Sequence, residues 1–222
     1  MNVNCLIFRL DPDSGSEAVY TPFRLEAEPA DTVLDVLIRI YRERDPDLSF
    51  RFACGVIKCG ECALVVNGVP CLACEKLVEP DMRIEPLPNL PLIKDLVIDR
   101  RAVFDRVFAL LPGFSRLAAS AGRAAAAVDP GTADRNVRLT KCFECLICQS
   151  ECPVRRDESE RFAGPLGLLW LAQAWASPLK ETVSGKEVEK TLQPCVRCGA
   201  CSDVCPCSED ILGLAIRVLE EG

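Results

Sequence analysis

Apolar and polar residues alternate along residues 2–10 and again along 20–27, and this period of two predicts a pair of β-strands. Between residues 32 and 43 the apolar positions recur at helical spacing instead, which predicts an amphipathic helix with Asp31 or Thr32 as its N-cap. The change of period indicates two strands and a helix that share one apolar core.

A second pair of short strands follows the helix. The stretch "ALVVNGVPCLA" places Asn67-Gly68 between two apolar runs, and this dipeptide favours the type I′ turn of a β-hairpin. A last short strand is expected in "MRIEPLP". Together these elements predict a compact α+β domain over residues 1–92.

The pattern becomes helical after about residue 91. The stretch "PLIKDLVIDRRAVFDRVFALL" predicts an amphipathic helix that stops at Pro112-Gly113, with Arg100, Arg101 and Arg106 on its solvated face. An Ala-rich stretch over residues 115–136 is interpreted as a helix or a linker. We therefore expect an all-helical second domain over residues 93–222.

One apolar stretch, residues 162–179, contains no charged side chain. Glycine, proline, glutamine and serine interrupt it, and its length only just reaches that of a membrane span. A buried helix of a soluble domain is therefore the expected structure, and we expect a soluble or peripheral subunit.

Cysteine is the most informative residue type, with 15 in a chain of 222 residues that has no histidine. A secreted disulfide scaffold is one explanation, but the N-terminus lacks a signal-peptide pattern and the count is odd. The thiols are also too densely spaced for separate disulfides to cross-link much of the chain. This spacing favours metal binding. The net charge of −7 argues against a nucleic-acid partner.

The first group of cysteines lies between residues 54 and 74. Three have C-x4-C-x2-C spacing and the fourth follows after a predicted hairpin, which is the pattern of a plant-type [2Fe–2S] site. Gly55 and Gly60 would let the backbone approach the sulfur atoms closely. A zinc site with four thiolates is the alternative, although the first spacing is too wide for a zinc knuckle. The predicted ligands are Cys54, Cys59, Cys62 and Cys74.

Two further runs, "CFECLICQSECP" and "CVRCGACSDVCP", form an internal repeat with C-x2-C-x2-C-x3-C-P spacing. In two-cluster ferredoxins of the bacterial type, three cysteines of such a run bind one [4Fe–4S] cluster and the fourth binds the other cluster. A zinc-stabilised interaction scaffold is the alternative. The predicted ligand sets are Cys142, Cys145, Cys148 and Cys205 for one cluster, and Cys195, Cys198, Cys201 and Cys152 for the other.

Three cysteines remain outside these patterns. We expect Cys5 in the core, Cys71 as a small apolar filler and Cys207 in a structural role beside the last run. Without histidine the chain has no Ser-His or Cys-His pair, and it has no glycine-rich phosphate loop. No residue is therefore assigned a catalytic role.

A plant-type segment followed by a two-cluster segment resembles the iron–sulfur subunit family of succinate dehydrogenase and fumarate reductase, over nearly the whole chain. The stretch "PLIKDLVIDRRAVFDRV" resembles the family's P-x-I-x-D-L-V-x-D segment, and "FAGPLGLLWLAQAW" resembles its L-G-P-x-x-L helix. The resemblance implies an α+β protein with an N-terminal plant-type ferredoxin (β-grasp) domain and an all-helical domain of bacterial two-cluster ferredoxin type.

The resemblance also implies a role as a non-catalytic electron-transfer subunit. Electrons would pass between a flavoprotein subunit that holds FAD and a quinone, a thiol- or CCG-type protein, a membrane anchor or another low-potential partner. The location implied is cytoplasmic, soluble or peripheral to the cytoplasmic membrane. An adaptor for a different flavoprotein or for a heterodisulfide reductase-type complex is the alternative.

The last cysteine run departs from most of the family, which has C-x5-C-x3-C-P there and holds a [3Fe–4S] cluster. Cys198 adds a fourth thiolate, so a [4Fe–4S] cluster of lower potential is expected. Val196 and Asp157 stand where quinone-reactive members have His and Trp, so the usual quinone pocket is not expected. Variant members with the extra cysteine work with CCG-domain partners, and here we expect such a domain on another polypeptide.

Overall fold

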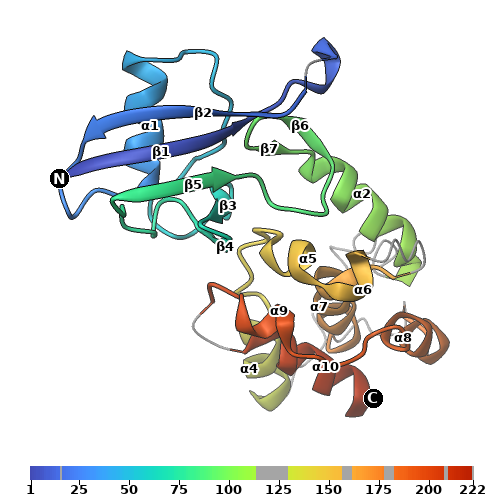
Figure 1. Ribbon diagram of the computed structural model, residues 1–222. Helices are drawn as coiled ribbons and strands as arrows, with labels where there is room; N and C mark the ends of the chain where they lie inside the picture. The colour runs from blue at the N-terminus through green and yellow to red at the C-terminus, as the bar shows by residue number, and fades with distance from the viewer. Residues whose placement is uncertain (16, 114–129, 157–161, 178–182, 208–209, 222) are drawn as a thin grey trace. The chain divides into compact units, whose positions relative to one another are not determined.

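The computed structural model shows two compact units (Figure 1). The domain boundary predicted after residue 92 stays a prediction. The first unit comprises residues 1–100 and 143–147, and the second comprises 101–142 and 148–222. The residues described are 1–15, 17–113, 130–156, 162–177, 183–207 and 210–221.

A five-stranded mixed sheet with the order β2-β1-β5-β3-β4 forms the centre of the first unit. The first strand pairs antiparallel with the second and parallel with the fifth. Along it Val3, Cys5 and Ile7 are buried while Asn4 and Leu6 are exposed, which confirms both the predicted alternation and the core position of Cys5. The strands are β1 (Asn2–Arg9), β2 (Val19–Glu26), β3 (Ala63–Val66), β4 (Val69–Leu72) and β5 (Asp81–Glu85), with the 3-10 helix η1 (Pro12–Ser14) between the first two.

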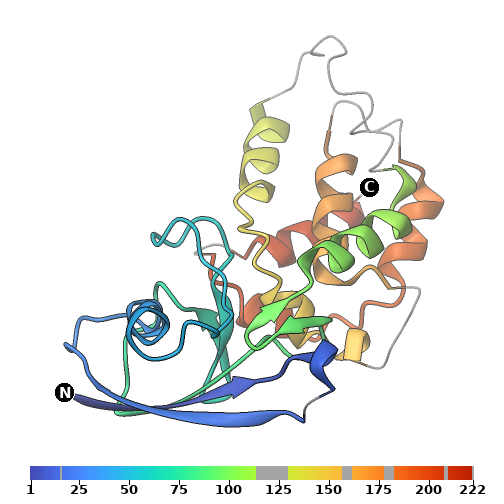
Figure 2. The ribbon, with the colours of Figure 1, turned by 90° about the horizontal axis from the view of Figure 1, so that it is seen from above.

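Helix α1 (Val33–Glu43) lies across one face of this sheet (Figure 2). Thr32 is its N-cap, and a reciprocal capping box with Asp35 satisfies two backbone N–H groups. Asn67 and Gly68 both have positive φ, as a type I′ turn requires, so the hairpin of β3 and β4 is confirmed.

The helix predicted from residue 91 begins later than expected. Residues 92–98 form a two-stranded sheet of β6 (Leu92–Lys94) and β7 (Val97–Ile98), and helix α2 (Arg100–Leu110) starts only afterwards. The reason is Asp95, whose buried carboxylate accepts hydrogen bonds from the backbone N–H groups of Leu10 (3.1 Å) and Ser49 (2.9 Å). These partners are remote in sequence, so the hydrophobic period could not reveal them.

The regular elements among the described residues of the second unit are all helices, which confirms the expected α+β fold with a helical C-terminal part. Helix α7 (Gly164–Trp175) is almost entirely buried and packs against α10 (Ile211–Glu221) (Figure 1). Within the described residues no helix is long and apolar enough to cross a bilayer. Residues 115–129 of the Ala-rich stretch lie outside the described residues. The helices after α2 are α4 (Pro130–Leu139), α5 (Ile147–Glu151), α6 (Pro153–Arg156), α7 (Gly164–Trp175), α8 (Gly185–Leu192), α9 (Ala200–Asp203) and α10 (Ile211–Glu221).

A buried glutamine joins the second cysteine run to the start of α7. The Gln149 side chain is fully buried, donates to the Ala163 carbonyl (3.1 Å) and accepts from the Leu166 backbone N–H (3.3 Å). Gly164 is required beside it, because a Cβ there would lie 2.0 Å from Oε1 of Gln149. The apolar helix therefore fixes the position of the cysteine run that precedes it.

Candidate metal centres

The loop around Cys54 directs backbone N–H groups at one sulfur atom. Sγ of Cys54 accepts from the N–H groups of Val56 (3.4 Å), Lys58 (3.4 Å) and Cys59 (3.3 Å). The hydrogen bond from Val56 has the largest effect, and together the donors lower the pKa of Cys54 to about 7, although burial acts to raise it. The loop thus stabilises a thiolate, which is the form that binds metal.

The β3–β4 hairpin brings the other half of this group together. Cys62 immediately precedes β3, and Cys74 lies two residues after the end of β4. The N–H of Ala73, between β4 and Cys74, donates to the carbonyl of Cys62 (3.0 Å). Burial raises the pKa of Cys62 to about 12. A thiolate at this depth needs a positive partner, which a bound metal would supply.

The three cysteine loops share a feature of backbone conformation. The residue after the second cysteine is left-handed in each loop, with φ of 67° at Gly60, 67° at Leu146 and 80° at Gly199. The two later runs also have a left-handed residue before that cysteine, with φ of 53° at both Glu144 and Arg197. Alternation of right- and left-handed residues turns successive N–H groups to one side and creates an anion-binding concavity. Such a backbone fits the anionic iron–sulfur clusters expected from the spacing.

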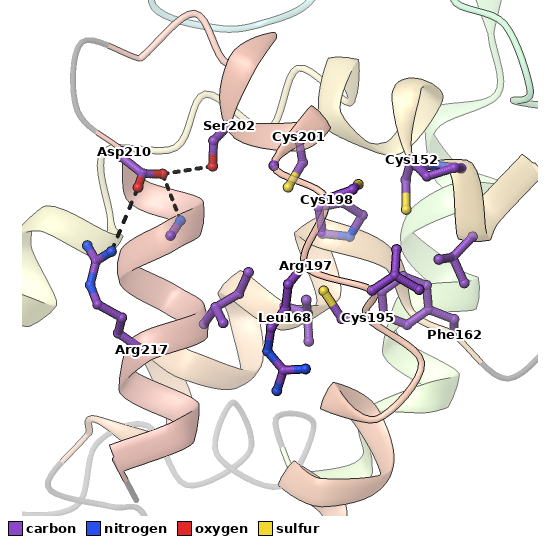
Figure 3. A pocket seen from close by; sticks show the side chains of 17 residues that line it. Cys152, Phe162, Leu168, Cys195, Arg197, Cys198, Cys201, Ser202, Asp210 and Arg217 are labelled. Carbon is purple, nitrogen blue, oxygen red and sulfur yellow. Dashed lines mark hydrogen bonds and ion pairs between the residues drawn. The ribbon is translucent and has the colours of Figure 1, made fainter.

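Four cysteines from both runs of the repeat line one cavity of about 340 Å³ in the second unit (Figure 3). Burial, together with Cys195 and Cys152 nearby, raises the pKa of Cys201 to about 11. Burial is also the largest cause of the raised pKa of Cys152. The four are the set predicted for the second [4Fe–4S] cluster, Cys152, Cys195, Cys198 and Cys201.

The remaining predicted set is divided between the two units. Cys145 is buried and belongs to the first unit, whereas the other three cysteines belong to the second. A hydrogen bond with the Cys207 thiol is the main cause that lowers the pKa of Cys205 to about 7. Cys207 therefore stabilises the thiolate of Cys205, a predicted ligand. The sequence had predicted only a structural role beside the last run.

No group of three or more Cys, Asp or Glu side chains among the described residues converges closely enough to hold a single metal ion. In an iron–sulfur cluster the thiolates bind different iron atoms, so they stand further apart than ligands that share one ion. The N–H donors of the loops and the cavity lined with cysteines are therefore the features that bear on cluster binding.

Two sequence expectations concern residues outside the cysteine pattern. Arg100 was expected on a solvated face, but its side chain is only 10% exposed, so that prediction was wrong. Val196 is 65% exposed beside the last run, and Asp157 lies outside the described residues. Burial of Arg100 depends on loops remote in sequence, and no local signal could have shown it.

Comparison with known proteins decides the family. Residues 4–105 match the 2Fe-2S iron-sulfur cluster binding domain, and residues 138–208 match the 4Fe-4S dicluster domain. The mitochondrial succinate dehydrogenase [ubiquinone] iron-sulfur subunit 1 of Oryza sativa is 30% identical over 212 residues, which cover 90% of this chain and 75% of the rice protein. The chain belongs to the succinate dehydrogenase/fumarate reductase iron–sulfur subunit family.

The chain is also similar to a second curated relative and to one solved structure. A subunit of the fumarate reductase (CoM/CoB) of Methanothermobacter marburgensis is 31% identical over 218 residues, or 98% of this chain. The chain spans only 43% of the length of that relative. A chain of the Mycobacterium smegmatis Sdh1 complex has the same fold, with a TM-score of 0.79 at 24% identity, over 99% of this chain and 94% of that one.

Proposed function

We propose that this chain relays electrons through one [2Fe–2S] and two [4Fe–4S] clusters within a succinate dehydrogenase- or fumarate reductase-like complex. The cavity lined by four cysteines is the observation that carries the proposal, because it brings together thiols from both runs in the number that a [4Fe–4S] cluster requires. Bound clusters would supply reversible one-electron chemistry. The proposed domains are residues 1–92 and 93–222.

The protein's own groups would hold the clusters and set their potentials. We assign the [2Fe–2S] cluster to Cys54, Cys59, Cys62 and Cys74, and the N–H donors to Cys54 would favour its reduced form. We assign the first [4Fe–4S] cluster to Cys142, Cys145, Cys148 and Cys205, and the second to Cys195, Cys198, Cys201 and Cys152.

The partners follow from this assignment. A flavoprotein subunit with FAD would carry out the chemistry on substrate, as the resemblance to the family implies. At the other end we propose a thiol- or CCG-type protein or another low-potential carrier. A [4Fe–4S] cluster at Cys198 would have a lower potential than [3Fe–4S], and Val196 lies where a quinone-reactive site would have His.

Anaerobic purification followed by metal analysis and EPR tests the proposal. We expect iron and sulfide in the ratio of one [2Fe–2S] to two [4Fe–4S] clusters, with no [3Fe–4S] signal in the oxidised protein. Cys198→Ser should create that signal, while the control Cys71→Ser should leave every cluster intact. Zinc in place of iron, or a strong [3Fe–4S] signal in freshly prepared wild-type protein, would contradict the proposal.

A further inference from the structure

Two cysteine loops that are remote in sequence touch inside the first unit. A Cβ added at Gly60 would lie 2.4 Å from the carbonyl oxygen of Phe143 and 2.8 Å from Cα of Cys145. Contact this close is possible only for glycine, which here also has a φ of 67°. The loop of the proposed [2Fe–2S] cluster therefore meets the loop of the first proposed [4Fe–4S] cluster, backbone against backbone.

The Arg100 guanidinium bridges the same two loops. One terminal nitrogen donates to the carbonyl of Glu144 (2.9 Å) and the other donates to the carbonyl of Gly60 at 3.4 Å. Its Nε lies 3.3 Å from a carboxylate oxygen of Glu61. The planar fork of arginine can reach both carbonyls at once, which the single ammonium of lysine cannot do in the same geometry.

Arg100 also places a buried positive charge beside both proposed centres. It lines one small cavity with Cys62 and Cys145, which are predicted ligands of the two different clusters. The Glu61 carboxylate is shared between Arg100 (3.3 Å) and Arg51 (3.1 Å). A positive charge stabilises whichever state of a nearby group is more negative, and for a cluster this is the reduced state.

We propose that Arg100 is the positioning residue of the junction between the [2Fe–2S] cluster and the first [4Fe–4S] cluster. Its fork holds the two loops in contact, and its charge raises the reduction potentials on both sides. An electron that crosses this contact oxidises one cluster and reduces the other by one electron, with no bond changed and no proton moved. The inference rests on the proposed function.

The test compares Arg100→Met, Arg100→Lys and the control Arg101→Met, whose native side chain is 91% exposed. The measurements are EPR-monitored titrations of both clusters and the magnetic coupling between them when both are reduced. Arg100→Met should lower both potentials and weaken the coupling. We expect each reduction equilibrium to change about threefold or more, where a tenfold change corresponds to about 59 mV for one electron.

The lysine variant separates position from charge. Arg100→Lys should keep potentials close to wild type but show the weakened coupling, because the charge remains while the bridge to two carbonyls is lost. Arg101→Met should match wild type in both measurements. Hydrogen exchange of the backbone amides in residues 143–147 gives a readout without redox chemistry, and it should quicken in both Arg100 variants.

Failure of the inference differs from failure of the proposed function. If wild-type protein lacks the clusters, the proposed function fails. If wild-type protein contains them and Arg100→Met shows unchanged potentials, coupling and exchange, only the role of Arg100 is wrong. Should Arg100→Met fail to take up iron, Arg100→Lys decides, because wild-type coupling and amide exchange in that variant would also overturn the inference.

Discussion

The two copies of the C-x2-C-x2-C-x3-C-P run share spacing and backbone conformation but differ in what surrounds the second cysteine, which is Cys145 in one copy and Cys198 in the other. Cys145, in the first copy, is 7% exposed and has Gly60 against its backbone. Cys198, at the same place in the second copy, is exposed. In the proposed assignment, one motif would therefore hold an interior centre around Cys145 and an outward-facing centre around Cys198.

The largest expected difference between the two copies comes from replacing the second cysteine of each run with serine. Cys145→Ser should remove its whole cluster, about four irons per chain, because a serine at this buried site lacks the soft thiolate that iron–sulfur clusters require. Cys198→Ser should instead lose about one iron and keep a [3Fe–4S] centre. Iron content and EPR of the two variants test this, and equal iron loss in both would show that the two environments are equivalent.

Gly60→Ala should disturb the interior centre by a smaller amount. The substitution places a methyl group on a residue with a left-handed backbone, against two main-chain groups that cannot move aside independently. We therefore expect the free energy of unfolding to fall by about 3 kcal/mol or more. Gly55→Ala is a matched control, because Gly55 also has positive φ but nothing lies within 4 Å of the added Cβ. Gly55→Ala should lower the free energy of unfolding by about 1 kcal/mol. Thermal unfolding under anaerobic conditions measures both, and similar losses would argue against close contact at Gly60.

The smallest expected effect concerns the outward-facing run. The Asp210 carboxylate accepts from the backbone N–H of Gly213 and from the hydroxyl of Ser202, both at 2.8 Å, and so joins the run to the start of α10 (Figure 3). Asp210→Ala should cost about 1 kcal/mol, as loss of a helix N-cap does. Asp210→Asn should restore most of this stability, because its amide oxygen can still accept. Chemical denaturation measures the difference, and equal losses would mean that the carboxylate does not act as a cap.

Local patterns were sufficient for much of the first unit. The alternation of residues 2–10, the Asn67-Gly68 turn and the Thr32 cap each depend on residues within a few positions of one another, and each is present in the structure. The cysteine spacing is local as well, and the proposed ligand sets were predicted from it. Residues 92–98 show where this approach fails, because a buried aspartate with distant partners replaced a helix by a hairpin.

The amino-acid sequence by itself determined which cluster is proposed at each site, since the spacing of thiols along a short loop limits which cluster the loop can wrap. Only the tertiary structure decided that Arg100 is buried between two of these loops and that Cys198 is exposed. Burial and contact depend on segments that are distant in the chain and meet only after folding. The chemistry of each centre is therefore encoded locally, while its neighbours and its exposure are properties of the whole fold.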